Sequence, residues 1–307
     1  MRKIFIIWNP FAGGNASKIC KRLSEKLDQE HIEYQVFDTH ETKSATKTVE
    51  QYLDSSFSDL IIIGGDGTIN EAVNGLEFDI PVSIIPAGTG DDFIKNVSLG
   101  KTLDDQTHTA INGTTPHDHT HTPPHPTITR IDLGQCNDRK FVNGVGIGFD
   151  GQIVEDMESK RVPLLKGHAA YYYHVLRILG GYRERIFQYQ IDEENHEKDL
   201  ILLTIGNGTT FGGGFKLMPD AKIDDGLLEI CEIGKVSGLR RFLNIHKLSN
   251  GTHGGIKEVS FYKAKTIKIM ANERLFAHID GERMGQPPFE IKVLPNALQL
   301  RVTSSSS

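Results

Sequence analysis

The sequence predicts two domains of different class: a doubly wound parallel α/β domain over residues 1–128, then a β-sandwich domain over residues 129–303. The first hundred residues alternate short apolar runs with helical periodicities. From residue 131 onward, short strand-like runs are separated by Gly, Asp and Asn. The length of 307 residues also favours two cores over one.

The first domain is predicted from apolar runs and helical spacing. Ile19, Leu23 and Leu27 recur every four residues, which marks one face of a helix. Leu60–Ile63 is wholly apolar, as expected for a strand buried on both faces. Further strands are expected at Lys3–Trp8, Glu33–Asp38 and Val82–Ile85, and further helices at Thr42–Ser55, Thr68–Leu76 and Asp91–Val97. This βαβαβαβα order predicts a parallel sheet.

A polar segment, Thr102–Thr129, breaks the pattern. Its part Thr114–Pro126 reads TTPHDHTHTPPHP and has no apolar periodicity, which indicates a surface loop. The four histidines of this insert follow no zinc spacing and have no cysteine nearby, so a solvated linker is preferred over a metal site.

The second domain is predicted from eight short strand-like runs and two helices. The helices are expected near His168–Leu179 and Ser237–Lys247. The aromatic part of the first helix could touch a membrane, but packing into the core is the preferred interpretation. The strands are expected at Phe141–Gly146, Ile186–Ile191, Leu200–Ile205, Leu227–Ile233, Thr266–Met270, Leu275–Ile279, Phe289–Val293 and Leu298–Val302.

Composition excludes several classes of protein. With 34 Lys plus Arg and 40 Asp plus Glu, the net charge of −6 argues against a general nucleic-acid binder. No apolar run reaches the ~18 residues of a membrane span. Three scattered cysteines contain no CxxC pair, so a reduced, cytoplasmic chain with buried cysteines is expected.

Four predicted strands are followed by segments that are rich in glycine or carry acidic and other polar residues. The segments that follow them are Asn9–Gly14, Asp38-Thr39, Gly64–Asn70 and Pro86–Phe93. Because the carboxyl ends of parallel strands meet at one edge of the sheet, these loops can build a single site. Glycines let backbone N–H groups approach phosphate oxygens, and an acidic residue among them, Asp66, calls for a cation in between. The pattern therefore predicts a nucleotide held with Mg²⁺.

Common nucleotide motifs are missing. The chain has no GxxxxGK[ST] phosphate-binding loop and no GxGxxG dinucleotide-binding motif after a strand. The characteristic motifs of protein kinases are also missing. The motifs it does have, Gly64–Thr68 (GGDGT), Pro86–Phe93 (PAGTGDDF), Gly148–Asp150, Pro219–Gly226 and Asp280–Glu282, resemble the diacylglycerol kinase catalytic family, which includes bacterial diacylglycerol kinases and YegS-like lipid kinases. The resemblance covers nearly the whole chain outside the insert. It implies a first domain similar to NAD kinase and phosphofructokinase.

The resemblance also implies site residues. Asp66 fits the acidic position that engages catalytic Mg²⁺, and Asp280 and Glu282 fit a late acidic pair. The resemblance favours Glu282 as the base, with Asp280 a close alternative. Alternation would place both carboxylates on one face of an extended segment, so that one takes the proton while the other positions Mg²⁺ or that base; a plain Asp-Gly turn is the other interpretation. The nucleotide-binding residues implied are Asn9, Pro10, Phe11, Ala12, Gly13, Thr39, Gly64, Gly65, Asp66, Gly67, Thr68, Ile69, Asn70 and Thr89.

A structural Mg²⁺ loop is implied between Lys222 and Leu227, with backbone carbonyls from these two residues and the carboxylate of Asp225 as ligands. One residue departs from the family pattern, since Asp91 stands where Asn is usual. The extra charge is harmless if the side chain faces away and caps the next helix. Otherwise it weakens ATP binding or raises the Mg²⁺ requirement.

The expected activity is ATP- and Mg²⁺-dependent transfer of a γ-phosphoryl group to a lipid hydroxyl, with diacylglycerol as the leading acceptor and phosphatidic acid as the product. The lipid is expected at a membrane surface, with the protein cytoplasmic or peripheral to the inner face, and a homodimer is left open. The alternatives are an NAD kinase-like enzyme of a soluble alcohol and a non-catalytic nucleotide or lipid sensor. No nucleic-acid partner is expected.

Overall fold

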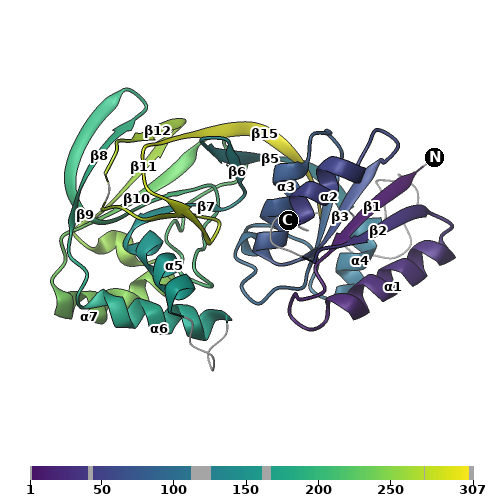
Figure 1. The fold of residues 1–307 in the computed structure, drawn as a ribbon, viewed down its shortest axis with the longest axis horizontal. Helices are drawn as coiled ribbons and strands as arrows, with labels where there is room; N and C mark the ends of the chain where they lie inside the picture. Colours follow the sequence, from purple (N-terminus) through teal and green to yellow (C-terminus); the bar gives the residue numbers. More distant parts are fainter. Residues whose placement is uncertain (1, 41–43, 112–125, 161–166, 273, 304–307) are drawn as a thin grey trace. The chain divides into compact units, whose positions relative to one another are not determined.

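The computed structural model describes residues 2–40, 44–111, 126–160, 167–272 and 274–303. The chain divides into two compact units, Met1–Ile131 with Asn296–Ser307, and Asp132–Pro295 (Figure 1). The histidines of the insert lie outside the described residues. The described part of Thr102–Thr129 is more regular than expected, because α4 (Leu103–Ile111) lies within it and β5 (Pro126–Cys136) begins before its end.

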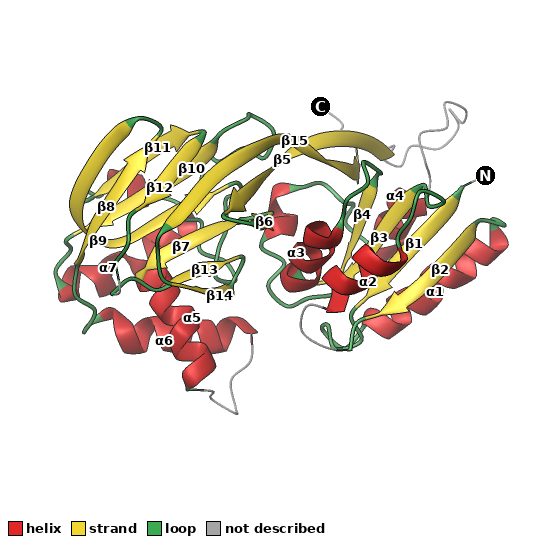
Figure 2. Cartoon of the chain, turned by 45° about the horizontal axis from the view of Figure 1, so that its top comes forward, coloured by secondary structure: helices red, strands yellow, loops and turns green. Residues whose placement is uncertain are grey.

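The first unit is the predicted doubly wound parallel sheet. Its strands follow the order β4 (Val82–Pro86), β3 (Asp59–Gly64), β1 (Lys3–Trp8), β2 (Glu33–Asp38), and all these pairs are parallel. One face packs against α1 (Ala16–Gln29) and α4 through a shared buried cluster. Phe5 and Phe37 stack on the other face, where Tyr52 of α2 (Ser44–Tyr52) continues the stack. Next to α2 lies α3 (Asp66–Gly75) (Figure 2).

Two expectations for the first unit are wrong in detail. The helix expected at Asp91–Val97 is only the short 3₁₀ helix η1 (Phe93–Asn96). The two last strands expected are a single strand, β15 (Phe289–Thr303), whose end pairs with β4 and so belongs to the first unit. A buried ion pair between Arg301 and Asp59 (2.5 Å) holds that end in place.

The second unit is mostly β, as predicted. Its sheet follows the order β14-β13-β7-β9-β8-β12-β15, with β10 and β11 joined through β9 and with β5 and β6 joined through β15. The helices α5, α6 and α7 cover a second apolar cluster. The remaining bounds are β6 (Arg139–Phe141), β7 (Gly144–Gly148), α5 (Phe149–Ser159), α6 (Gly167–Leu179), β8 (Arg185–Ile191), β9 (Glu194–Gly206), β10 (Leu228–Gly234), α7 (Gly238–Asn250), η2 (His253–Gly255), β11 (Val259–Ala264), β12 (Thr266–Ile269), β13 (Ala277–Ile279) and β14 (Glu282–Gly285).

Helix α5 is absent from the sequence prediction, as are the strands β5, β11 and β14. The helix follows β7 without a linker, because Gly148 has φ +88° and reverses the chain in one residue. Ile153 and Val154 are buried in this helix. Phe149, Ile153 and Met157 recur every four residues, and this spacing was the signal that could have found the helix.

Candidate functional site

Three of the predicted rim loops interlock at the carboxyl edge of the first sheet. The side-chain amide of Asn9 donates a hydrogen bond to Thr68 Oγ1 (3.2 Å), which joins the loops after β1 and β3. A Cβ on Gly13 would lie 2.2 Å from the carbonyl oxygen of Ala87, and a Cβ on Gly88 would lie 2.6 Å from Cα of Gly65. The glycines are therefore required for close backbone approach, and they bring the three loops into one surface.

Two helices begin directly behind these loops, α1 with its N-cap at Asn15 and α3 with its N-cap at Gly65. Within the described residues, neither N-cap makes a side-chain capping bond. Helix N-termini carry unsatisfied N–H groups and partial positive charge. Together with the glycine loops, they make this edge suited to an anion such as a phosphate.

Asp66 begins α3 and reaches across to the loop after β4. Its two carboxylate oxygens accept hydrogen bonds from the backbone N–H groups of Asp92 and Phe93, both at 3.0 Å. Burial raises the pKa of Asp66, and the neighbouring charge of Asp92 adds to that rise. Asp66 thus ties two rim loops together, and each of its oxygens keeps a lone pair for a further partner.

Asp91 faces into the rim rather than away from it. Its φ is +48°, and its Oδ1 would lie 2.6 Å from a Cβ on Gly88. Among the described residues this buried Oδ1 has no hydrogen-bond partner. Burial raises the pKa of Asp91, as does the charge of Asp66. The N-cap of η1 is Asp92, so the expectation that Asp91 could face away and cap the next helix is wrong. An orphaned carboxylate oxygen beside Asp66 fits a divalent cation.

The other predicted nucleotide-binding residues differ in exposure. Phe11 is 77% exposed, and Thr89 is also exposed, so their side chains are open to a ligand. Thr39 continues the β2–β1 ladder by donating its N–H to the carbonyl of Trp8 (3.0 Å). In contrast, the side chains of Ile69 and Asn70 are buried within α3. Only their backbone could serve a ligand at the rim.

Asp280 and Gly281 form a two-residue hairpin turn between β13 and β14, with φ of +47° and +82°. The expected extended segment with both carboxylates on one face is therefore wrong. One Asp280 oxygen accepts the N–H groups of Asn143 (3.0 Å) and Gly144 (2.7 Å), and the other accepts that of Val142 (2.8 Å). This carboxylate anchors the strand connection before β7.

Glu282 begins β14, and its side chain is 29% exposed. Its carboxylate contacts the guanidinium of Arg139 in β6. A carboxylate held by one arginine and open to solvent can still receive a proton from a hydroxyl. Of the two predicted base candidates, the geometry therefore favours Glu282.

The proposed structural ion loop is closed by protein contacts. One oxygen of Asp225 pairs with Lys263 Nζ (2.9 Å), and the other accepts the N–H of Leu227 (3.1 Å). Hydrogen bonding to Asp225 raises the pKa of Lys263. The oxygen donors suit a hard cation, but an ion here has to displace an ammonium group. The residues do not fit Mg²⁺ in this arrangement.

The second unit contains a buried polar cluster for which the sequence predicts no role. His278 Nε2 lies 3.0 Å from Asp150 Oδ2, and the hydroxyl of Tyr171 donates to Asp150 Oδ1 (2.9 Å). Burial works against both charges, but the mutual attraction outweighs it, so the pKa of His278 is raised and that of Asp150 is lowered. A Cβ on Gly146 would lie 2.3 Å from both partners, which explains the glycine in β7.

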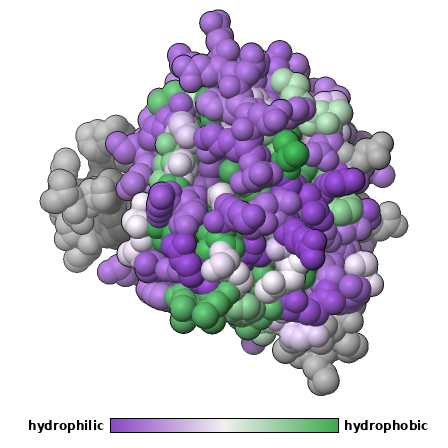
Figure 3. All heavy atoms as spheres, turned by 90° about the vertical axis from the view of Figure 1, so that its left-hand side faces the viewer, coloured by the Kyte–Doolittle hydropathy of each residue, from purple (hydrophilic) through white to green (hydrophobic). Residues whose placement is uncertain are grey.

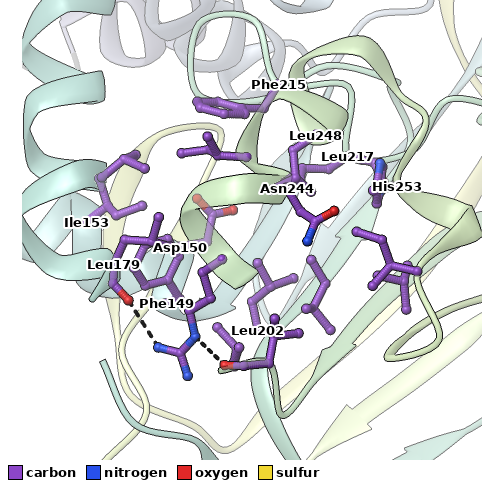
Figure 4. A pocket seen from close by; sticks show the side chains of 18 of the residues that line it. Phe149, Asp150, Ile153, Leu179, Leu202, Phe215, Leu217, Asn244, Leu248 and His253 are labelled. Atoms are coloured by element: carbon purple, nitrogen blue, oxygen red, sulfur yellow. Dashed lines mark hydrogen bonds between the residues drawn. The ribbon is translucent and has the colours of Figure 1, made fainter. Parts of the chain in front are cut away.

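An apolar cavity of about 80 Å³ adjoins this cluster. Asp150 is one of its few polar groups; side chains of α5, α6, α7 and β9 supply most of the wall (Figure 4). Val175 and Leu179 come from α6, and Ile245 and Leu248 come from α7. The lining suits an alkyl chain rather than a polar metabolite.

Comparisons with known proteins match both units. Residues 3–122 match the family described as the diacylglycerol kinase catalytic domain, and residues 143–302 match the YegS C-terminal NAD kinase beta sandwich-like domain. A diacylglycerol kinase of Bacillus subtilis (strain 168) is 29% identical over 94% of this chain and 93% of its own. One from Staphylococcus epidermidis (strain RP62A) is 30% identical over 92% of this chain and 86% of its own.

Solved structures show the same fold. A diacylglycerol kinase candidate from Bacillus anthracis superposes with a TM-score of 0.77 at 24% identity, covering 99% of this chain and 98% of that one. An NAD kinase from Archaeoglobus fulgidus in complex with ATP gives a TM-score of 0.52 at 12% identity over 99% of this chain and 94% of that one. With both domains matched and a relative 30% identical along nearly its whole length, the chain belongs to the diacylglycerol kinase family and is a kinase.

Proposed function

We propose that the protein is an ATP- and Mg²⁺-dependent lipid kinase that phosphorylates diacylglycerol to phosphatidic acid. Family membership supports the reaction class. The observation that supports a lipid acceptor is the apolar cavity in the second unit. Most of its wall is alkyl and aromatic, and its polar side chains include Asp150, Arg241, Asn244 and His253. Most hydroxyl groups of a soluble sugar or nucleoside would face alkyl side chains in this cavity and lack hydrogen-bond partners, at a cost in binding free energy.

The nucleotide is assigned to the rim of the first unit. Backbone N–H groups of the Asn9–Gly14 and Gly64–Thr68 loops, with the N-termini of α1 and α3, bind the phosphates. Asp66 and Asp91 hold Mg²⁺, which supplies charge neutralisation for the transferring group. Glu282 accepts the proton of the acceptor hydroxyl, while Asp280 fixes the turn that carries it. Asp150 orients the lipid end that projects from the cavity.

The rival within the same fold is an NAD kinase-like enzyme of a soluble alcohol. An assay with radiolabelled ATP across diacylglycerol, a sphingoid base, phosphatidylglycerol and NAD separates the two. We expect label in phosphatidic acid, with no transfer to NAD. Label in NADP alone would overturn the lipid assignment. Nucleotide binding without transfer to any acceptor would support a sensor instead.

A further inference from the structure

Helix α7 is apolar on two opposite faces. Arg241, Asn244, Ile245 and Leu248 line the cavity. On the opposite face, Leu239 is 74% exposed, Leu243 63% and Phe242 43%, and the helix has no fully buried residue. A helix of a soluble protein ordinarily turns polar residues to solvent. Its outer face therefore lacks the partner that such apolar side chains require.

The neighbouring helix extends this surface. Tyr172, Tyr173 and Leu176 of α6 are also exposed, and the hydroxyl of Tyr172 contacts Ser249 Oγ of α7 at 2.9 Å. Figure 3 shows apolar side chains gathered at its lower edge, where Figure 1 has α6 and α7. We call Leu239, Phe242, Leu243, Tyr172, Tyr173 and Leu176 the helical apolar face.

The charge around this face is positive although the chain is acidic. Residues 167–183 and 235–250 contain no Asp or Glu, in a chain of net charge −6. Their basic residues are Arg177, Arg183, Lys235, Arg240, Arg241 and Lys247. Within the described residues, Arg183, Lys235 and Lys247 have no carboxylate partner. The other three, Arg177, Arg240 and Arg241, pair with Asp156, Glu258 and Glu184.

Two of the unpaired cations lie at the start of α7. Arg183 and Lys235 line a surface hollow with Ser237, Arg240 and Glu184, and the carboxylate of Glu184 is paired with Arg241. The first turn of α7 contains no acidic residue, and its N-cap Ser237 makes no side-chain capping bond among the described residues. Exposed N–H groups and two cations beside exposed leucines match a bilayer surface, with anionic headgroups above and acyl chains below.

We propose that α6 and α7 dock the protein on an anionic membrane surface, with Leu239, Phe242 and Leu243 entering the interface and Arg183 and Lys235 contacting lipid phosphates. The inference deepens the proposed function, because the same α7 forms the wall of the apolar cavity. Docking places that cavity one helix away from the bilayer, from which a water-insoluble acceptor must come. Among the described residues, no helix combines the length and the hydropathy of a membrane span.

The test measures co-sedimentation with phosphatidylcholine vesicles with and without phosphatidylglycerol. We expect binding that needs phosphatidylglycerol and weakens with salt. Leu239→Ser/Leu243→Ser should lower the partition coefficient at least ~10-fold. The matched control is Ile186→Ser/Met270→Ser, which alters two other exposed apolar side chains of the same unit (54% and 40% exposed) and should bind like the wild type. Arg183→Gln/Lys235→Gln should bind more weakly than Lys47→Gln/Lys257→Gln, which has the same change in net charge.

Three results would overturn the proposal: no binding by the wild type, equal loss in the apolar control, or retained binding in Leu239→Ser/Leu243→Ser. Self-association through the face, detected by light scattering, with no vesicle binding would assign it to a second copy instead. Activity on a short-chain diacylglycerol in neutral detergent micelles is measured in parallel. If Leu239→Ser/Leu243→Ser keeps its activity in micelles but no longer binds vesicles, the result supports both the docking surface and the lipid kinase function. Vesicle binding that depends on α7 but no activity on any lipid defeats the proposed function alone.

Discussion

At the scale of single residues, the carboxylates of this protein do different work according to their partners. Asp280 is saturated by three backbone N–H groups, Glu282 keeps solvent access beside one arginine, and Asp91 holds a buried oxygen without a partner. Carboxylates that are close in sequence therefore have different chemical environments. Removing the charge of each one should affect activity and stability differently.

Glu282→Gln should lower kcat ~10²- to 10⁴-fold with little change in ATP affinity, because a general base acts in the transition state and not in ground-state binding. Asp280→Asn should instead lose about 1 to 3 kcal/mol of stability, because buried N–H groups lose acceptors. Steady-state kinetics and urea unfolding on both variants distinguish the roles. A stable, inactive Asp280→Asn with an active Glu282→Gln would reverse the assignment.

Asp91→Asn should raise the Mg²⁺ concentration needed for half-maximal activity, because the side chain that the proposed function places on the ion loses its negative charge. The folded pKa of Asp91 is raised, so its ionisation costs stability as pH rises through that value. The substitution should therefore raise Tm by on the order of 2 °C at neutral pH and by less near pH ~4. Thermal scans at both pH values check the sign, and an equal shift at both would contradict it.

His278→Asn should destabilise the second unit most in mild acid. Because the pKa of His278 is raised in the folded state, its charge stabilises the protein at pH values below the ordinary histidine pKa. This stabilisation is lost as pH rises through the raised pKa. Because the pKa of Asp150 is lowered in the folded state, its charge stabilises the protein at pH values above the ordinary aspartate pKa. This stabilisation is lost as pH falls through the lowered pKa. We expect a loss of about 3 to 5 kcal/mol near pH ~5.5 and a smaller loss near pH ~8.5. Tyr171→Phe, which removes one hydrogen bond only, should cost about 1 kcal/mol and serves as the control.

At the scale of elements, the site depends on loops that approach one another through glycine. Each of the loops after β1, β3 and β4 has a glycine where a Cβ would overlap another loop, so their spacing is set by backbone contact. Helices α1 and α3 then point their N-termini at the same edge. This arrangement brings three strand ends into one surface that suits an anion.

Gly88→Ala tests that contact. The new Cβ would lie 2.6 Å from both Cα of Gly65 and Oδ1 of Asp91, so the two loops must separate. We expect ATP affinity to fall at least ~10-fold and the protein to lose about 1 to 3 kcal/mol of stability. The control is Gly255→Ala, where nothing lies within 4 Å of the new Cβ. Calorimetric ATP titration that gives wild-type affinity for Gly88→Ala would show that the loops adapt.

At the scale of the whole molecule, the last residues of the chain complete the first unit. Strand β15 leaves the second unit and ends beside β4, where Asp59 contacts both Arg301 and Arg2. Burial raises the pKa of Asp59, but the two arginines and Ser58 outweigh it and hold the pKa below its ordinary value. A single carboxylate therefore joins the two ends of the sequence within one unit.

Asp59→Asn should cost the first unit about 3 kcal/mol or more, because two guanidinium groups lose their counter-ion. Since the pKa of Asp59 is lowered in the folded state, its contribution to the free energy of unfolding is present above the ordinary aspartate pKa and disappears as pH falls. Wild type and variant should differ at neutral pH and converge near pH ~3 in urea unfolding. A pH-independent difference would assign the loss to packing rather than charge.

The amino-acid sequence by itself determined the strands β1 to β4, the helices α1 to α3, the glycine-rich edge and the family, because each is written in local spacing or in contiguous motifs such as Gly64–Thr68 and Pro86–Phe93. Only the tertiary structure decided the rest. The prediction that Asp280 and Glu282 share one face required an extended chain, and the backbone instead forms a left-handed turn at Asp280-Gly281. The inward aim of Asp91, the pairing of Asp150 with His278, the return of β15 to the first unit and the two-faced helix α7 all depend on residues far apart in sequence. Burial and charge at such positions are set by contacts that a linear pattern does not contain.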